Sequence, residues 1–364
     1  MVQKIPASGL DSQRPFRNLL INGDMQIAQR GTSQTGVANN ASEGYNTLDR
    51  FGLYYFGNEG GVATVSQDTT VPSDTTYGKF SKSLKIDVTT ADTSIGATGS
   101  HAIKQTIESS YIHHSGWDYT SSSSKITLQF WAKSVKAGDY HIMFRCHDAS
   151  GERYYISKYT LVANTWKHIE IVVPGDSNLV FNDDNGEGLE VRWMLSAGDD
   201  RNDATADTWF APGSDFDQTT NTQVNFFDST DNNFFLTGVQ LEIGDTASDF
   251  EHLPHDVQLQ RCQRYFQSYI DPPLRGAVNA TSAMGRLGMV LPVTMRAAGT
   301  ASLGTHGVYD GSNVTSISST TVAYISDKQM EFDVGLAAAS VVVGRPGIVY
   351  QSGGTTTTTL DAEL

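Results

Sequence analysis

The stretch FFLTGVQLEIGDTASDFEHLPHDVQLQRCQRYFQSY, residues Phe234–Tyr269, decides the fold because its apolar period changes part-way through. Between Phe235 and Ile243 every second residue shares a face, which predicts a strand that ends at Gly244. From Asp256 onward the apolar residues fall at the spacing of one helical stripe: Leu259, Cys262, Phe266 and Tyr269. We therefore expect the last strand of one β domain, followed by a helix that leads into a second domain.

Strand-like segments of about six residues recur along the chain, separated by turns rich in Gly, Asp and Asn. Before the helix their spacing is typical of a sandwich or jelly roll, with Leu19–Ile27 as a first strand beside the last one. Further strands are expected at Thr222–Asp228 and in the terminal segment TTTTTLDAEL.

The sequence thus predicts a mainly β protein with an N-terminal jelly-roll β-sandwich, one linking α-helix and a smaller C-terminal β domain. The corresponding ranges are an N-terminal arm at 1–16, the sandwich at 17–253, the helix at 254–273 and the C-terminal β domain at 274–364.

The charge of the chain bears on its partners. Its 364 residues carry a formal net charge of −15, which argues against nucleic-acid binding because phosphate contacts require clustered Lys and Arg. No run of about 20 apolar residues occurs, so no membrane insertion is expected. The N-terminus lacks the apolar segment of a signal peptide, so we expect synthesis in a cytoplasm. Cys146 and Cys262 fall in different predicted domains and are interpreted as two buried thiols.

Several segments resemble, in order and spacing, those of a family of phage virion proteins. These proteins are tail-fibre, tail-tip or receptor-binding subunits with a jelly roll similar to a carbohydrate-binding module. The segments that carry the resemblance are NLLINGDMQIAQRG (18–31), LDRF (48–51), ITLQFWAKS (126–134), NTWKHIEIVVPGD (164–176), LEVRWMLSAG (189–198), DTWFAPG (207–213), residues 234–267 and the terminal LDAEL.

The resemblance implies a non-enzymatic component of the phage tail, located in the virion and synthesised in the host cytoplasm. Its implied partners are copies of itself in a homotrimer, other phage tail proteins, and a host cell-surface glycan or receptor. Two alternatives stay open, a polysaccharide-degrading tail enzyme and a free carbohydrate-binding lectin.

Self-association would bury apolar surface that the second domain cannot cover alone. Its core is expected to be thin, and the linking helix is expected to expose one apolar face. We therefore expect Cys262, Phe266 and Tyr269 to be buried against another subunit or the base of the sandwich. The alternative is a monomer whose helix packs on its own sandwich.

The polar loop YIHHSGWDYTSSSS (111–124) is the candidate sugar site. Trp117 and Tyr119 can stack on the apolar face of a sugar ring, while Asp118 and His114 can bond hydroxyl groups. The alternative is that these aromatic rings pack against the rim of the sandwich. Three other tryptophans, Trp131, Trp166 and Trp193, are expected in the core, and Trp209 is expected to close an edge of the sandwich.

Carbohydrate-binding modules of this shape often hold a structural calcium between the first and last strands. The positions that this sequence offers there are Asp24, Gln26, Gln240 and Glu242, with Thr237-Gly238 in place of the usual paired Asp. No other cofactor is expected. His113-His114 and His141/His147 lack the helical spacing or the partner cluster that zinc requires, and the acidic loops 182–188 and 197–207 lack a calcium-loop spacing.

No catalytic residue is predicted. The chain has no GxSxG, HExxH, phosphate-binding or dinucleotide-binding motif. Nothing in it places two carboxylates across a groove, as glycoside hydrolysis requires. It also lacks the repeat of a parallel β-helix.

Overall fold

The computed structural model describes residues 16–39, 42–57, 59–149, 152–213, 216–270, 272–278, 284–304, 306–312, 314–337, 344–350 and 357–364. The predicted arm at 1–16 lies outside these residues apart from Phe16. The chain forms two compact units, one up to Gln258 and one from Leu259 to Glu363, and each is described by itself. Both are built from β-strands, so the predicted mainly β fold is confirmed.

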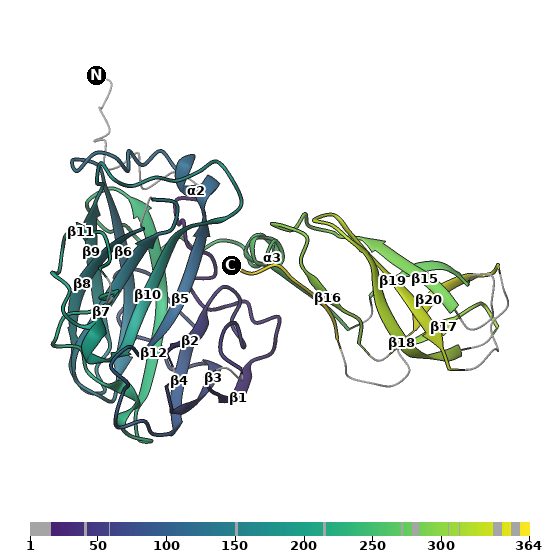
Figure 1. Ribbon diagram of the computed structural model, residues 1–364, viewed down its shortest axis with the longest axis horizontal. Helices are drawn as coiled ribbons and strands as arrows, with labels where there is room; N and C mark the ends of the chain where they lie inside the picture. Colours follow the sequence, from purple (N-terminus) through teal and green to yellow (C-terminus); the bar gives the residue numbers. More distant parts are fainter. Residues whose placement is uncertain are drawn as a thin grey trace. The chain divides into compact units, whose positions relative to one another are not determined.

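The first unit is a jelly-roll sandwich of two six-stranded antiparallel sheets (Figure 1). Sheet A has the order β1-β3-β4-β12-β6-β9, and sheet B has the order β11-β8-β7-β10-β5-β2. The strands of sheet A are β1 Ser33–Val37, β3 Val62–Asp68, β4 Ser83–Thr90, β6 Lys125–Ser134, β9 Lys167–Pro174 and β12 Asn233–Ile243. Those of sheet B are β2 Gly52–Phe56, β5 Ser100–Glu108, β7 Gly138–Cys146, β8 Arg153–Leu161, β10 Glu187–Ala197 and β11 Trp209–Phe210.

The main core lies between the two sheets, and both contribute large apolar side chains to it. Representative members are Ile86, Phe130, Leu241, Ile103, Phe144 and Trp193. Short helices join the strands, namely α2 Ser109–His113, η1 Asp199–Arg201 and η2 Phe226–Asp228. Strands β5, β7 and β10 lie in the middle of sheet B. Each has one face toward this core and a second face that points away from it.

Strand β12 forms as predicted, but its inward face changes at Gly238. This residue has a φ of 64°, and the pairing with β6 shifts register between Thr237 and Gln240. The bulge moves the alternation by one residue, since two residues on one strand face one on the other. Phe234 and Leu236 therefore point into the core before the bulge, and Val239 and Leu241 do so after it.

The predicted first strand, Leu19–Ile27, is wrong. Asn22 has a φ of 62°, so the backbone there is left-handed, and the Asn22 amide bonds both the nitrogen and the carbonyl of Ile27. The segment still runs beside β12, because Val239 N donates to Gly23 O at 2.9 Å. A Cβ on Gly23 would lie 1.9 Å from Val239 O, so only glycine permits this approach.

The predicted strand Thr222–Asp228 is also wrong. The segment ends in the short helix η2, whose first turn is capped by Asn225 Oδ1 accepting from Phe227 N at 3.0 Å. Phe226 and Phe227 are both fully buried. Two consecutive buried aromatic residues do not fit a strand that alternates between a core face and a solvent face.

The linking helix is shorter than the predicted 254–273. Helix α3 spans His255–Gln263 and is followed by a turn in which Tyr265 N donates to Cys262 O. Phe266–Tyr269 is strand β13, which pairs with β21, Thr358–Asp361, at the far end of the chain. The predicted helix is wrong for Phe266 and Tyr269, because pairing with a distant strand, rather than local spacing, determines their conformation.

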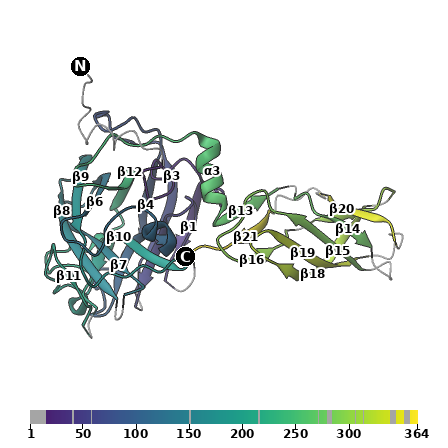
Figure 2. The ribbon, with the colours of Figure 1, turned by 90° about the horizontal axis from the view of Figure 1, so that it is seen from above.

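The second unit is the smaller β domain expected toward the C-terminus, and it begins at Leu259 rather than at residue 274 (Figure 2). It contains the three-stranded sheet β13-β21-β16 and the closed barrel β14-β15-β19-β18-β17-β20. The strands not yet given are β14 Arg275–Val278, β15 Met284–Val290, β16 Thr300–Ser302, β17 Gly307–Tyr309, β18 Val314–Ile325, β19 Gln329–Leu336 and β20 Pro346–Tyr350. The threonine-rich strand predicted at the C-terminus is confirmed as β21. Leu287, Phe332 and Leu360 lie in the core of this unit.

Two further features agree with the sequence. Cys146 and Cys262 are both buried and both unbridged. In the described ranges, no helix has the length and apolar character that crossing a bilayer requires.

Candidate functional site

The outer face of sheet B, which points away from the core, gathers charged side chains around Glu190 of β10. Cross-strand pairing places Glu190 opposite Thr106 of β5 and Arg145 of β7. Glu190 Oε2 accepts from Lys104 Nζ at 3.1 Å and from the Thr106 hydroxyl at 3.4 Å, and Oε1 pairs with Arg192 Nε. The Glu190 residue is only 1% exposed, so this carboxylate holds two cations in a nearly dry environment.

The protonation state of Glu190 follows from these neighbours. Burial opposes ionisation, but Arg192, His147 and Lys104 together outweigh it and hold the pKa of Glu190 well below its usual value. The carboxylate is therefore ionised throughout the neutral range. Removing either cation would leave part of a buried charge without a partner, which is costly.

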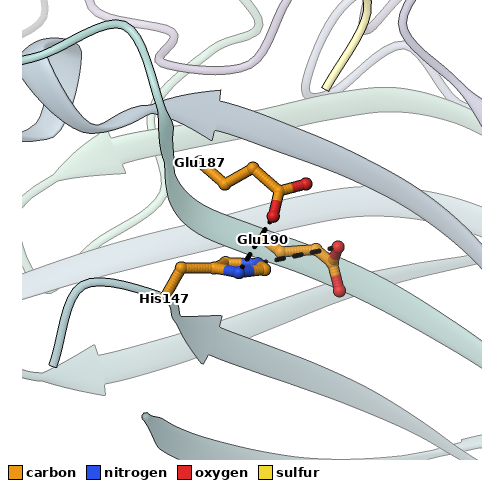
Figure 3. A group of neighbouring side chains, drawn as sticks. All are labelled: His147, Glu187 and Glu190. Carbon is orange, nitrogen blue, oxygen red and sulfur yellow. Dashed lines mark ion pairs between the residues drawn. The ribbon is translucent and has the colours of Figure 1, made fainter. Parts of the chain in front are cut away.

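His147 lies between two carboxylates at one end of this network (Figure 3). Its Nδ1 is 3.1 Å from Glu187 Oε2, and its Nε2 is 3.8 Å from Glu190 Oε2. A register shift between Glu187 and Leu189 brings Glu187 and Glu190 to one side of β10, although they are three residues apart. His147 therefore has two acidic partners, which the sequence did not indicate.

The side chains of the triad His147, Glu187 and Glu190 have the types of atom that bind metal ions. Their three potential ligand atoms lie within 4.8 Å of one another, the one such group of three or more in the described ranges, and His147 Nε2 is buried with no hydrogen bond. Against this, the Glu190 oxygen that faces His147 already binds the Lys104 ammonium, and Arg192 holds the other oxygen. A divalent cation would meet two fixed positive charges, so the triad fits an ion-pair network better.

Aromatic rings lie beside this network on the edge strand β2. Tyr54 and Phe56 stack with ring centroids 6.3 Å apart and planes within 20°. The Lys104 ammonium lies 4.2 Å from the centroid of the Tyr54 ring, and the Arg192 guanidinium lies 4.1 Å from that of Phe56. Both aromatic residues are half-buried. The two rings thus form a strip that is partly open and is held in place by cations.

A second polar group borders Glu190 on the side of β7 and β8. Arg145 Nε donates to Glu152 Oε2 at 3.1 Å, and the Tyr154 hydroxyl donates to the same oxygen at 3.0 Å. Burial raises the pKa of Glu152, but the Arg145 and Tyr154 bonds overcome this and lower it overall. Arg145 and Glu152 are both half-buried and reach the surface. The outer face of sheet B therefore combines an apolar strip with oriented donors and acceptors.

The predicted sugar loop is arranged differently from the expectation. Trp117 is 3% exposed and belongs to the main core, so its ring faces cannot stack on a sugar. Tyr119 packs edge-on against Phe181 with centroids 4.9 Å apart. His114 Nε2 lies 2.8 Å from Asp183 Oδ1 at the surface. The rim-packing alternative describes this loop, because the core supplies the apolar contacts that both rings require.

Asp118, the fourth predicted sugar ligand, is exposed and accepts a hydrogen bond from the Thr120 hydroxyl at 3.1 Å. With Trp117 buried, no aromatic ring face accompanies Asp118 and His114. The structure therefore does not bring the four predicted residues together into a stacking site.

The two calcium candidates have their own protein partners. Glu242 Oε1 accepts from Ser248 N at 2.9 Å and from Gln240 Nε2 at 3.0 Å, and Oε2 accepts from the Ser248 hydroxyl at 2.6 Å. Both oxygens of Glu242 are thus used by donors of the chain, and Arg17 Nε lies 3.5 Å from Oε2, so the carboxylate is stabilised without a metal ion. The Gln26 amide donates to the Ser81 hydroxyl and is likewise engaged.

Asp24 is buried and lies outside this group of donors. It accepts a hydrogen bond from Gln258 Nε2 at 3.0 Å, while its Oδ1 has no hydrogen-bond partner. Burial raises the pKa of Asp24, although Gln258 and His252 act in the opposite direction. Burial thus opposes the ionised oxygen that a calcium ligand requires.

The three predicted interface residues are covered within a single chain. Cys262 and Phe266 are buried, and Tyr269 is half-buried against the core of the second unit. The expected exposed apolar helix face is therefore absent at these described residues. Helix α3 ends before Phe266, so the stripe that motivated the prediction is not formed.

The tryptophans divide between two places. Trp193 lies in the main core as predicted, but Trp131 packs with Phe80 and Phe250 in a separate cluster, with Trp166 at its margin. Trp209 lies in the edge strand β11 and donates to Pro174 O at 2.7 Å.

The comparisons with known proteins give distant likenesses only. The sequence matches no protein-family model and no curated protein. The enzymatically active domain of tailspike protein 4 of bacteriophage CBA120 is similar, with 14% identity over 64% of this chain and a TM-score of 0.33, and the match spans only 22% of that chain.

Carbohydrate-binding modules are also similar to the chain. A family 4 module has 13% identity over 61% of this chain and 98% of the module, with a TM-score of 0.30. A family 11 module from Clostridium thermocellum, solved with a mixed-linked tetrasaccharide, has 12% identity over 61% of this chain and 99% of the module, with a TM-score of 0.29. Values this low identify neither a family nor a ligand for this chain.

Proposed function

We propose that this chain is a non-enzymatic adhesion subunit of a phage tail fibre or tail tip, and that its sandwich binds a host-surface glycan on the outer face of sheet B. One observation carries the glycan part: the partly open Tyr54–Phe56 strip lies directly beside the charged network of Glu190. A sugar ring has an apolar C–H face and a rim of hydroxyl groups, and this surface offers a partner for each.

The roles of the side chains follow from their exposure. Tyr54 and Phe56 would contact the apolar face of the sugar, because their rings are half-buried rather than covered. Glu187, Arg145 and Glu152 would bond hydroxyl groups, because all three reach the surface. Glu190, which is almost fully buried, would act indirectly by holding Lys104 and Arg192 against the two rings.

The placement in a phage tail rests on the resemblance of the ordered segments to virion subunits. Self-association into a homotrimer is part of the same proposal. It draws support from the exposed apolar residues of the barrel: Tyr309, Val314, Val322, Tyr324 and Ile348. Burial of such a surface in an oligomer is favourable. These residues replace Cys262, Phe266 and Tyr269 as the proposed interface.

The test combines a glycan array with an assay for reducing ends. We expect the purified chain to bind a small set of array glycans and to release no reducing ends from them. A cryo-EM map of the phage particle should contain the chain in its tail. Turnover of a bound glycan would contradict the non-enzymatic role and favour the polysaccharide-degrading alternative. Binding by a chain that is absent from the particle would favour the free lectin.

A further inference from the structure

The barrel of the second unit has a depression on its outer wall that the proposed glycan site does not involve. Its cavity volume is about 390 Å³, which is within the range of roughly 300–1,000 Å³ for small-molecule sites. It is lined by residues of β14, β15 and β19: Arg275, Gly276, Arg286, Gly288, Met289, Val290, Gln329 and Glu331.

Strand register explains why a hollow forms there. Arg275 of β14 pairs with Gly288 of β15, which pairs with Glu331 of β19, so the middle residue of this row has no side chain. A Cβ at Gly288 would lie 2.8 Å from Glu331 Cγ and 3.0 Å from Met330 O. Glycine is therefore needed for space, and any larger residue would displace the Glu331 side chain.

The two arginines that line the depression differ in the partners that their side chains already have. Arg286 at one end is held by Asp333 through two bonds of 2.8 and 2.9 Å. The Arg275 backbone pairs within the barrel, but its exposed guanidinium makes no ion pair or hydrogen bond with any residue that the structure describes. A guanidinium without a partner beside a hollow is ready to accept a planar anion, and a carboxylate matches its fork of donors.

The remaining walls suit a sugar. Gln329 offers both a donor and an acceptor, and Glu331 offers an acceptor, each from a half-buried position. Val290 is 76% exposed at one end of the hollow, and the half-buried Met289 lies next to it in the lining. Hydroxyl partners next to apolar surface fit a sugar ring better than a bare anion.

We propose that this depression is a second binding site, specific for a sugar that carries a carboxylate, in which Arg275 binds the carboxylate and Gln329 and Glu331 bind ring hydroxyls. It belongs to a different unit from the outer face of sheet B, so it does not depend on the proposed function. The two sites can be tested separately in one full-length chain.

The experiment is a titration of the full chain, followed by NMR or calorimetry, with three probes at matched concentrations: methyl glucuronide, methyl glucoside and acetate. We expect saturable binding of the glucuronide that is at least tenfold tighter than that of the other two. Equal binding of acetate would show that the site recognises only the negative charge, and it would overturn the assignment of a sugar as the ligand. Equal binding of the glucoside, or no saturable binding of the glucuronide, would overturn the site.

Variants locate the binding. Arg275→Ala should weaken glucuronide binding at least tenfold, and Gly288→Val should weaken it by filling the hollow. The matched control is Arg345→Ala, which removes an exposed guanidinium of the same unit that bonds Ser312 and does not line the depression. Thermal unfolding of Arg275→Ala should be unchanged, because the side chain is exposed.

Three outcomes would contradict this placement. They are unchanged binding in Arg275→Ala, an equal loss in Arg345→Ala, and a loss caused by Tyr54→Ala in sheet B rather than by Arg275→Ala. If glycans on the array still bind the Arg275→Ala chain, the proposal for sheet B stands, whether or not the barrel binds the glucuronide.

Discussion

At the scale of single residues, His101 is the clearest source of pH dependence. It is fully buried, its Nδ1 faces the Ser196 hydroxyl, and its ring stacks on Phe227 with centroids 4.2 Å apart. Burial lowers its pKa from 6.5 to about 4, although the bond to Gly60 O acts in the opposite direction. The folded state therefore binds fewer protons than the unfolded state between these two values.

Stability from a neutral His101 is fully present above about pH 6.5 and is lost as the pH falls toward about 4, by about 3 kcal/mol in total. His101→Gln removes this titration. We expect its free energy of unfolding, measured in urea at several pH values, to fall less than that of the wild type over this range. Parallel curves for the two chains would contradict the assignment.

At the scale of elements, Phe266 tests the strand that replaced the predicted end of the helix. Phe266→Ala should destabilise the second unit by about 3–5 kcal/mol, the usual cost of truncating a buried Phe. Ser268→Ala in the same strand is the control, because Ser268 is half-exposed and should cost little. Chemical unfolding monitored by tyrosine fluorescence measures both. A cost for Phe266→Ala no greater than that of the control would show that β13 adds little stability.

The sequence predicted those elements that local alternation determines. Strand β12 ends at Ile243, directly before Gly244 as expected, because every second residue on either side of its bulge shares a face. Prediction failed where a left-handed residue such as Asn22 breaks the alternation, and where a partner far along the chain decides, as for Phe266 in β13. A short stretch of sequence around the residue shows neither cause.

The candidate site could not be predicted for a related reason. Lys104 and Glu190 are 86 residues apart along the chain, and only the register of β5 and β10 brings their charges together. Trp117 was misplaced because a polar loop sequence does not show that one of its rings turns inward. The Tyr54-Tyr55-Phe56 run was a usable signal, since alternation in a strand sends two of the three rings to the same face.

At the scale of the whole molecule, self-association is the proposal with the largest consequence. We expect the purified chain to sediment as a trimer. The double variant Val322→Ser/Tyr324→Ser should shift it toward the monomer, because it removes exposed apolar surface from β18. Val162→Ser is the matched control, since Val162 is 66% exposed but belongs to the sandwich. A monomeric wild type, or an equal shift in the control, would rule out this interface.

The central claim is that the outer face of sheet B binds a glycan, and one comparison tests it most directly. It is the affinity of Tyr54→Ala and of Tyr77→Ala for the best-bound array glycan, measured by calorimetry on the full chain. Tyr77 is also half-buried and its ring stacks on His168 of sheet A, so its removal controls for general loss of aromatic surface. We predict a loss of tenfold or more in Tyr54→Ala and none in Tyr77→Ala. Unchanged affinity in Tyr54→Ala, or a loss confined to Tyr77→Ala, would contradict the account.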